Sequence, residues 1–545
     1  MKTDYIQNYM RCKVNAMANI EEVINMNCLD NKVENVFKLR ESKEIFRMGK
    51  LFNTEKNHYY YDVGTGKVIQ LDEESYKILS FIFYGDNKIS WEEFQHSLDE
   101  KEVDSLDELN KVIEEEDLFK APVMERLYTV NHYENLENSV NSNLTQVILE
   151  LTGRCNLRCG YCIYNESYSG NRNFNNNDMT LEVAKAAIDY TREHSGEEVA
   201  VTFYGGEPLI KFDLLKWCIE YAKETIKDKK LTFSFTTNLT LVTEEIANYL
   251  ATVDNLSVLC SLDGPEDVQN SYRKYIDGRG TFNEAIRGLK YLAEAFKNNS
   301  TSSIGINGVF APPYTFEKIE RINEFFESLE WLPENVYVSI SYVSRGTVDD
   351  KDHIEELLKD PRYNINGGLI NVLETWGEEK FVKSKGILKD YRNVVDESIN
   401  RRLLTIHNRR ITKKAAPIYK FNSCCVPGSR RLYVNTKGDF YVCERVGSSP
   451  SIGNVFSGID LDKIKKFYIK DYSDGSIDSC SKCWAAGLCN DCYVDNYTEE
   501  GFNKEHKNAG CTSIRNVVEE AFVFYHTMLE NSPEKLDDLN EIQIM

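Results

Sequence analysis

Three closely spaced cysteines could bind a metal cluster. Cys155, Cys159 and Cys162 are arranged as Cys-x3-Cys-x2-Cys. A [4Fe–4S] cluster normally takes four thiolates, so three thiolates leave one iron without a protein ligand. An open iron can chelate the amine and the carboxylate of S-adenosylmethionine, and an electron passed to the sulfonium then releases a 5′-deoxyadenosyl radical. A structural zinc site is the alternative, but zinc requires four closed ligands and no nearby histidine supplies the fourth.

A second group of eight cysteines lies in the C-terminal part of the chain. Paired Cys-x2-Cys units are typical of zinc ribbons, whereas eight thiolates could also hold two [4Fe–4S] clusters. Spacing alone slightly favours zinc, and the cluster predicted upstream favours iron and sulfur. Four cysteines outside both groups are expected to be small buried residues, namely Cys12, Cys28, Cys218 and Cys260. The group itself consists of Cys424, Cys425, Cys443, Cys480, Cys483, Cys489, Cys492 and Cys511.

The first motif directly follows the first strand of a repeating pattern. From Leu144, short apolar segments alternate with amphipathic helical segments, which predicts a parallel β/α array with function at the carboxyl ends of its strands. Six strands fit a partial (β/α)6 barrel over residues 144–345 better than a closed eight-stranded one. The expected strands are Thr145–Leu151, Val199–Tyr204, Leu231–Thr237, Leu256–Leu262, Ile304–Phe310 and Val336–Tyr342.

Residues 144–345 resemble the radical S-adenosylmethionine superfamily. Tyr204-Gly205-Gly206-Glu207-Pro208 ends the second strand, and in that family the matching backbone and carboxylate bind the methionine amine. Taken alone, the tripeptide Gly205-Gly206-Glu207 could also be a plain turn. For Ile306, a buried position in its strand is an equally good interpretation. The resemblance implies an S-adenosylmethionine site formed by Tyr161, Gly205, Gly206, Glu207, Thr237, Asn238, Ser261, Asp263, Arg273 and Ile306.

Residues 416–515 resemble the SPASM domain of peptide-modifying radical enzymes, because Cys425 opens a Cys-x-Pro-Gly motif and Glu444 follows Cys443. The resemblance implies two auxiliary [4Fe–4S] clusters, and therefore three clusters in all. Two departures exist: the last spacing is x2 instead of x3, and the segment between Cys425 and Cys443 has no further cysteine. We therefore expect the near cluster to have an iron open to a substrate thiolate, with Cys424 as a doubtful fourth ligand. The far set comprises Cys480, Cys483, Cys489 and Cys511, and the near set comprises Cys425, Cys443 and Cys492.

Residues 44–125 predict a small winged-helix-like α+β domain with three strands followed by three helices. Twelve acidic and three basic residues between Ser90 and Lys120 argue against DNA binding. The segment from Tyr59 to Asp72 resembles the peptide-recognition element of ribosomal-peptide maturases, which binds a leader peptide as an added edge strand. An ancillary packing domain is the alternative.

The rest of the chain has weaker patterns. Residues 1–43 receive no role, 126–143 are expected to be a linker, 346–415 a helical bridge and 516–545 a C-terminal helix. The net charge of −22 argues against nucleic-acid and anionic-membrane partners. No apolar run reaches the roughly 18 residues of a membrane span, and the N-terminus lacks a signal-peptide pattern, so we expect a cytoplasmic protein.

Together these patterns predict a radical peptide maturase of the thioether-forming sactipeptide or ranthipeptide synthase type. Its expected partners are a Cys-containing precursor peptide and an electron donor such as flavodoxin or ferredoxin. Alternatives are carbon–carbon crosslinking, epimerisation, or formylglycine formation on a sulfatase, and, as a different class, a non-catalytic zinc-binding peptide-recognition protein. The sequence identifies no general base.

Overall fold

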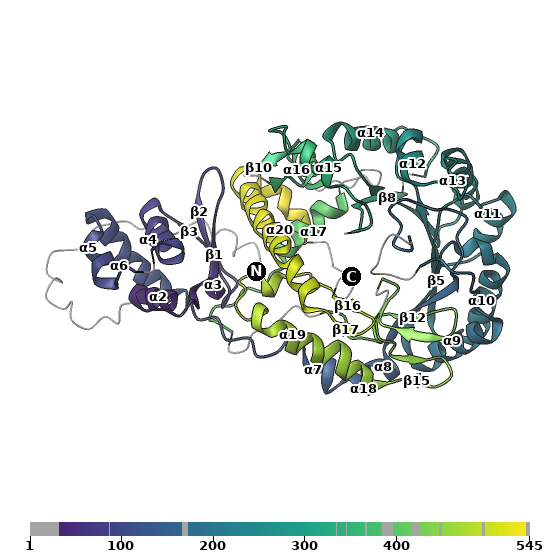
Figure 1. The fold of residues 1–545 in the computed structure, drawn as a ribbon, viewed down its shortest axis with the longest axis horizontal. Coiled ribbons are helices and arrows are strands. Elements are labelled where there is room, and N and C mark those ends of the chain that lie inside the picture. The colour runs from purple at the N-terminus through teal and green to yellow at the C-terminus, as the bar shows by residue number, and fades with distance from the viewer. Residues whose placement is uncertain are drawn as a thin grey trace.

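The structure is a computed structural model of the 545-residue chain. It describes residues 32–540 except 87, 166–172, 334, 345, 366–367, 384–395, 417–423, 446–448 and 493–495. An N-terminal α/β unit lies at one end of the molecule and a curved sheet with its outer helices lies at the other, and helices from the C-terminal part of the chain lie between them (Figure 1). Among the described residues, none of the helices combines the length and the apolar composition that a membrane span requires.

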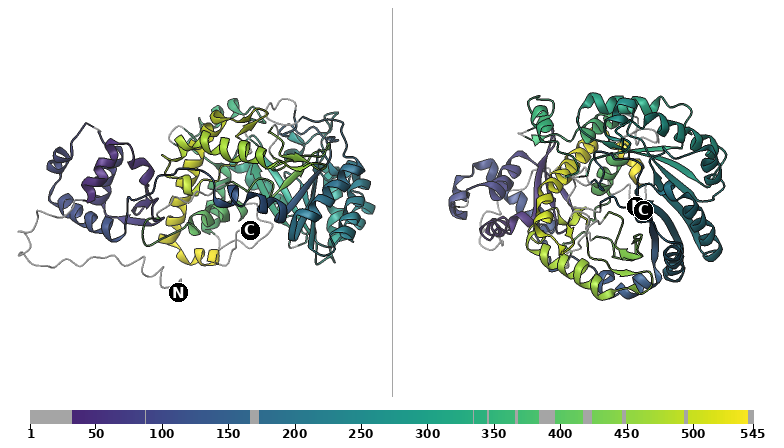
Figure 2. Two further views of the ribbon diagram at one scale, coloured as in Figure 1. Left: turned by 90° about the horizontal axis from the view of Figure 1, so that it is seen from below. Right: turned by 45° about the vertical axis from the view of Figure 1, so that its right-hand side comes forward.

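Six parallel strands form the curved sheet and pair with one another in chain order. Helices cover its convex face as an outer arc (Figure 2). The strands and most of these helices lie where the sequence predicts them, within a few residues. The strands are β4 (Leu144–Thr152), β5 (Ser195–Gly205), β6 (Lys230–Thr237), β7 (Leu256–Ser261), β8 (Ser303–Phe310) and β9 (Tyr337–Tyr342). The helices are α9 (Leu181–His194), η1 (Pro208–Lys211), α10 (Phe212–Thr225), α11 (Glu244–Leu250), α12 (Glu266–Tyr272), α13 (Phe282–Phe296) and α14 (Phe316–Glu327).

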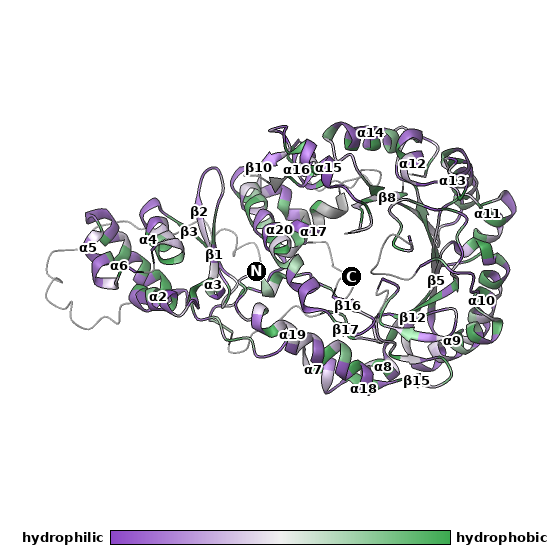
Figure 3. Ribbon diagram, in the orientation of Figure 1, coloured by the Kyte–Doolittle hydropathy of each residue, from purple (hydrophilic) through white to green (hydrophobic). Residues whose placement is uncertain are grey.

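The two faces of this sheet differ because successive strand residues point to opposite sides. Apolar residues such as Phe203 and Phe235 belong to the core that the outer helices close. These helices turn their apolar sides to the sheet and their polar sides outward (Figure 3). The other face is polar: Thr202 Oγ1 lies 2.8 Å from Ser234 Oγ and accepts a 2.7 Å hydrogen bond from Gln146. A polar concave face is what a charged cofactor requires.

The sheet continues beyond the barrel into the cysteine-rich region. The strand β12 (Leu432–Val434) pairs in parallel with β4. It is followed by β13 (Asp439–Tyr441), β14 (Gly453–Asn454) and β15 (Gly458–Ile459), which pair antiparallel, so the sheet has ten strands. The sequence does not predict the parallel pairing of the β12–β13 hairpin with β4. This pairing fixes the hairpin that carries Cys443 to the first barrel strand.

The N-terminal unit has three antiparallel strands in the order β1 (Gly49–Asn53), β2 (His58–Asp62) and β3 (Val68–Leu71). The first strand begins later than expected, because Ile45–Met48 forms a helical turn, α3, with Ile45 and Met48 on one buried face. A helix in residues 1–43, α2 (Lys32–Glu41), was not predicted, and residues 1–31 lie outside the described part. The other helices are α4 (Glu73–Tyr84), α5 (Trp91–Ser97) and α6 (Glu100–Glu115).

This three-stranded sheet is buried on both sides. Tyr60 and Leu51 pack on the unit's own helices. On the opposite face, Phe52 and Tyr61 lie 5.3 and 4.6 Å, ring to ring, from Phe522 of the C-terminal helix α20 (Lys504–Asn531). The N-terminal unit is therefore fastened to the last helix of the chain.

The remaining elements connect these parts. Residues 126–143, expected to be a linker, contain two short helices whose Leu136 and Val140 are buried. The C-terminal helix starts before residue 516 and includes Cys511, so it crosses the predicted boundary of the cysteine-rich domain. The elements are α7 (Val130–Tyr133), α8 (Leu136–Ser142), α15 (Lys351–Leu357), β10 (Asn364–Ile365), β11 (Gly368–Leu369), α16 (Val372–Lys383), α17 (Asp396–His407), α18 (Leu461–Lys463), η2 (Ile464–Lys470), α19 (Asp471–Cys480), η3 (Ala486–Leu488), β16 (Tyr497–Thr498), β17 (Gly501–Phe502) and η5 (Pro533–Asn540).

Candidate functional site

The three-cysteine loop leaves the carboxyl end of β4 and is held by the segment after α12. The backbone N–H of Arg158 donates to Lys274 O at 2.8 Å, and that of Gly160 donates to Tyr272 O at 2.9 Å. Within the loop, the N–H of Cys162 donates to Cys159 O at 3.0 Å and closes a turn. These bonds fix the loop at the strand end where the sequence predicts function.

The three thiols share one buried environment. Burial raises the pKa of Cys155 and Cys159 to about 12 and also raises the pKa of Cys162. Two N–H groups approach the sulfur of Cys155: the backbone of Leu157 at 3.4 Å and the side chain of Asn238 at 3.9 Å. Thiols with raised pKa values stay protonated until a metal displaces the protons. Three such donors, all sulfur, fit a [4Fe–4S] cluster with one open iron better than they fit zinc.

The end of β5 supports the start of this loop through two glycines. The N–H of Gly206 donates to Thr152 O at 2.9 Å. A Cβ on Gly205, whose φ is +137°, would lie 2.3 Å from that same oxygen, and one on Gly206 would lie 2.1 Å from Arg154 O. Only glycine permits this approach. The Gly-Gly-Glu segment is thus a cradle beneath the cysteine loop as well as a turn.

Glu207 follows the glycines and is almost completely buried. Its carboxylate accepts hydrogen bonds from Thr237 Oγ1 at 2.9 Å, the N–H of Asn238 at 2.7 Å and the N–H of Leu209 at 3.1 Å. Burial raises the pKa of Glu207 to about 7. A carboxylate has about four acceptor positions, so one remains for a ligand ammonium.

Asp263, just after β7, joins two further strand ends to the cysteine loop. Its carboxylate accepts hydrogen bonds from Arg273 Nε at 3.0 Å, from the N–H of Val309 at 2.9 Å and from the hydroxyl of Tyr161. The guanidinium of Arg273 also lies 5.5 Å above the Tyr161 ring. Tyr161, Asp263 and Arg273 therefore form one buried polar cluster beside Cys159 and Cys162.

The last two residues predicted for this site lie at and near the same strand ends. Ser261 is the final residue of β7, is buried, and pairs in register with Asn307. Ile306 is fully buried between Cys260 and Val338 of the neighbouring strands and belongs to the hydrophobic core. This matches the buried strand position considered for Ile306, and its contact with S-adenosylmethionine stays a prediction.

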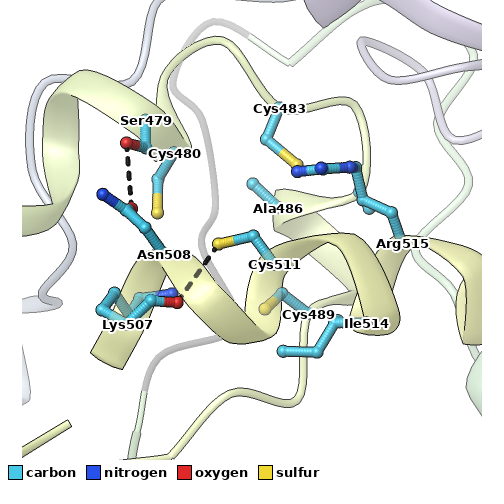
Figure 4. A pocket seen from close by; sticks show the side chains of 11 residues that line it. Ser479, Cys480, Cys483, Ala486, Cys489, Lys507, Asn508, Cys511, Ile514 and Arg515 are labelled. Carbon is cyan, nitrogen blue, oxygen red and sulfur yellow. Dashed lines mark hydrogen bonds between the residues drawn. The ribbon is translucent and has the colours of Figure 1, made fainter. Parts of the chain in front are cut away.

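The far set of cysteines comes together around one cavity of about 240 Å³. Cys480 ends α19, Cys483 lies in the next turn, Cys489 follows η3, and Cys511 comes from α20. Their side chains turn toward one space (Figure 4). In the described part of the chain, no three Cys, His, Asp or Glu side chains are grouped tightly enough for a single metal ion. Four thiols around one cavity could hold either a [4Fe–4S] cluster or zinc.

A buried polar network beside this cavity was not predicted from the sequence. Lys507 lines the cavity and forms a 3.1 Å ion pair with Asp491. Tyr472 Oη and Asn496 Nδ2 also donate to Asp491, at 3.0 and 2.7 Å. Two features of the sequence could have pointed to this network: Lys507 lies one helical turn before Cys511, and Asp491 lies inside a Cys-x2-Cys unit.

The near set is less compact in the described part of the chain. Cys425 and Cys492 are exposed, and Arg430 Nη1 lies 3.5 Å from Cys425 Sγ. Cys443 follows β13 on the hairpin that pairs with β4. The doubtful ligand Cys424 is mostly buried and its thiol donates to Asp491 O at 3.6 Å. Burial, and to a smaller extent the neighbouring Cys492, raise the pKa of Cys424.

The four cysteines outside both groups were expected to be buried. Cys218 and Cys260 are fully buried, as predicted. Cys12 and Cys28 lie outside the described residues.

Comparison with known proteins agrees with this geometry. Residues 149–326 match the family model described as the Radical SAM superfamily. The radical SAM cyclopropyl synthase TigE of Paramaledivibacter caminithermalis is 23% identical over 444 residues, which span 78% of this chain and 83% of TigE. A cysteine-type anaerobic sulfatase-maturating enzyme of Clostridium perfringens is 32% identical over 157 residues, 28% of this chain and 41% of that enzyme.

A solved structure shares the fold. The structure of native anSMEcpe with bound AdoMet superposes with a TM-score of 0.50 at 21% identity, and the match covers 71% of this chain and all of that one. The predicted α/β architecture of the central region is thereby confirmed, and the sequence match confirms the superfamily resemblance of residues 149–326.

Proposed function

We propose that this chain, whose residues 149–326 match the Radical SAM superfamily, modifies a ribosomally made peptide by joining a cysteine sulfur to a carbon atom. The observation that carries the radical chemistry is the three-cysteine loop held over Gly205 and Gly206. The observation that adds the auxiliary clusters is the separate cavity of the far set. The same chain also has a small N-terminal sheet with an edge strand that could bind a peptide.

The residues around the first loop have distinct roles in this proposal. Cys155, Cys159 and Cys162 would hold the [4Fe–4S] cluster. When bound, the cluster and S-adenosylmethionine supply a carbon-centred radical that removes a hydrogen atom from the substrate. Glu207, with one free acceptor position, would receive the methionine ammonium. Because an unquenched radical reacts with whatever lies nearest, the buried strand ends must hold the substrate close and exclude water.

Asn238, Thr237 and Ser261 would provide the other polar contacts to S-adenosylmethionine. Asn238 makes two contacts in this site. Its backbone N–H donates to the Glu207 carboxylate, and its side-chain amide approaches the sulfur of Cys155. The Asp263–Arg273 pair would hold the cluster loop in place through Tyr161, which lies within that loop. These assignments follow from the gathering of polar groups at successive strand ends, where ligands bind in open α/β sheets.

The far set would hold an auxiliary cluster with four thiolates, and the near set a cluster with three. In this proposal Cys424 is not a ligand of the near cluster, and its thiol donates to Asp491 O instead. A substrate cysteine could then bind the open iron of the near cluster as a thiolate. This would hold its sulfur in place for attack by the carbon radical.

The leader of the substrate would bind along β3. The opposite edge strand, β1, contacts α20, and its Lys50 forms a 2.9 Å ion pair with Glu519. In the described sheet β3 pairs only with β2. Its Ile69 faces the helices of the N-terminal unit and is partly buried, whereas Gln70 on the other face is exposed. Main-chain pairing with an extended peptide is therefore possible along this edge.

Carbon–carbon bond formation is the second candidate reaction. It is favoured by the match with TigE, which extends over 78% of this chain and is named as a cyclopropyl synthase. The two reactions differ in the bond that the carbon radical forms. The same cysteine sets would serve electron transfer in either case.

The proposed setting is the cytoplasm, with a flavodoxin or ferredoxin as the electron donor. The thirteen cysteines of the described residues are all free thiols, as expected in a reducing compartment.

Anaerobic reconstitution with iron and sulfide tests the cofactor content. The proposal predicts about twelve iron atoms per chain, since each cubane holds four. It also predicts cleavage of S-adenosylmethionine under dithionite. A chain that binds zinc instead, without iron and without cleavage, would be a zinc-binding peptide-recognition protein.

A further inference from the structure

A buried ion pair lies between the two auxiliary cysteine sets. Lys507 Nζ is 3.1 Å from Asp491 Oδ2, and their side chains are only 3% and 9% exposed. The pair is not part of the hydrophobic core, and none of the roles proposed above requires it.

Lys507 is the residue of this pair that lies beside the far set of cysteines. It lines the cavity together with the four far cysteines, and its carbonyl oxygen accepts the thiol of Cys511 at 3.4 Å (Figure 4). Because Lys507 and Cys511 are four residues apart on α20, they lie on the same face of that helix. The ammonium group is therefore fixed beside the far set.

Asp491 connects the far set with the near one. Its N–H lies 3.5 Å from Cys489 Sγ of the far set, and its carbonyl oxygen accepts the thiol of Cys424 at 3.6 Å. The next residue, Cys492, belongs to the near set. The carboxylate is held in place by Tyr472, Asn496 and Lys507.

Stability alone is a weak reason to keep such a pair. Taking two charges out of water costs several kcal/mol per ion, and apolar residues of similar size are often as stable or more so. A fixed charge beside a redox centre has a different effect. A positive charge stabilises the reduced form, which carries one more negative charge, and so raises the reduction potential.

We propose that Lys507, oriented by Asp491, is a positioning residue whose fixed positive charge makes the far site the preferred electron acceptor of the two auxiliary sites. This rests on the proposed function, in which the carbon radical and the thiolate sulfur combine and release one electron. With clusters bound at both sets, that electron would reduce the near site, pass to the far site, and leave to a one-electron acceptor protein of the iron–sulfur or flavin class. In the passage between the two sites, one centre loses an electron and the other gains it, with no proton moved and no bond broken.

The test is a redox titration followed by electron paramagnetic resonance on the full-length reconstituted chain. The far signal is identified by its loss in Cys511→Ala. Lys507→Met, which removes the charge and keeps the chain length, should keep its iron and shift the far midpoint potential to more negative values. Lys507→Arg should restore the potential of the unchanged protein. The matched control is Lys504→Met on the same helix, since Lys504 is exposed and pairs with Asp478 at the surface.

An unchanged far potential in Lys507→Met, or the same shift in Lys507→Arg, would overturn the inference. If the methionine variant does not retain iron, Lys507→Gln decides the question by the same titration. Failure of the proposed function would look different: a chain without auxiliary clusters would lack the far signal altogether, and a chain that forms another bond would keep this signal and leave the substrate cysteine unjoined.

Discussion

The backbone N–H of Asn238 donates a 2.7 Å hydrogen bond to the buried carboxylate of Glu207. This bond joins the end of β6 to the segment that follows β5. The Asn238 side chain then reaches toward the sulfur of Cys155. A displacement of either strand end is therefore transmitted to the cluster loop, and the predictions below use this coupling and others like it.

Gly206→Ala should displace the cysteine loop. The added Cβ would lie 2.1 Å from Arg154 O, a backbone atom that cannot turn away. We expect loss of about four iron atoms per chain and loss of S-adenosylmethionine cleavage. Gly196→Ala, near the start of β5, meets only an ordinary 3.6 Å contact and should keep both. If Gly206→Ala keeps full iron and full cleavage, the cradle is not needed.

Cys159→Ala should abolish cleavage of S-adenosylmethionine, because two thiolates cannot hold a cubane with an open iron. The auxiliary signals should remain, since the far cavity is separate. The measurement is 5′-deoxyadenosine release under dithionite together with the iron content. Release at the rate of the unchanged protein would show that this loop does not bind the radical cluster.

Ile69→Glu should weaken leader binding at least tenfold, or about 1.4 kcal/mol, because it places a charge on the helix-facing side of β3. Gln70→Glu adds the same charge on the other face and serves as the control. Titration of a labelled leader peptide measures both affinities. Equal affinities in the two variants and the unchanged protein would locate recognition elsewhere. A deletion of residues 1–125 is less informative, since it would uncover Phe522 on α20.

Cys424→Ala and Cys443→Ala should differ. The first removes a thiol that donates to Asp491 O, so the near cluster should keep its iron and its spectrum. The second should lose crosslinking while S-adenosylmethionine is still cleaved. Loss of iron in Cys424→Ala would instead make Cys424 the fourth ligand of a closed near cluster, which could transfer electrons but not bind the substrate sulfur.

His526 should make stability depend on pH. It is buried between Phe52 and Tyr59, and burial lowers its pKa to about 3 from the ordinary 6.5. Below pH 6.5, His526 therefore binds a proton in the unfolded chain but stays neutral in the folded chain. Folding should lose about 1–2 kcal/mol between pH 6.5 and 5 from this residue. Melting temperatures of the reconstituted protein and of His526→Phe, compared across this range, should converge as the pH falls. Parallel curves would contradict the assignment.

The sequence predicts the barrel well because its strands and helices have clear periodicity. It predicts the cysteine loop and Glu207 because each directly follows a strand. It does not predict the pairing of β12 with β4, because that contact joins segments almost 300 residues apart in the chain and leaves no local pattern. The same applies to the packing of Phe52 on Phe522. The Lys507–Asp491 pair joins residues much closer in the chain, but the cysteine spacing does not predict that these two side chains meet. For α2, the apolar residues were visible, but their packing against α6 was not predicted.

The most direct test of the central claim is incubation of the reconstituted protein with S-adenosylmethionine, a reductant and a leader-bearing peptide that contains cysteine. The account predicts that the peptide loses the mass of two hydrogen atoms per crosslink. Fragmentation should then locate a bond between a cysteine sulfur and a carbon, and a serine-for-cysteine peptide should stay unchanged. Loss of the same mass from the serine peptide would favour a carbon–carbon bond. Release of 5′-deoxyadenosine without any change in the mass of the cysteine peptide would contradict the account.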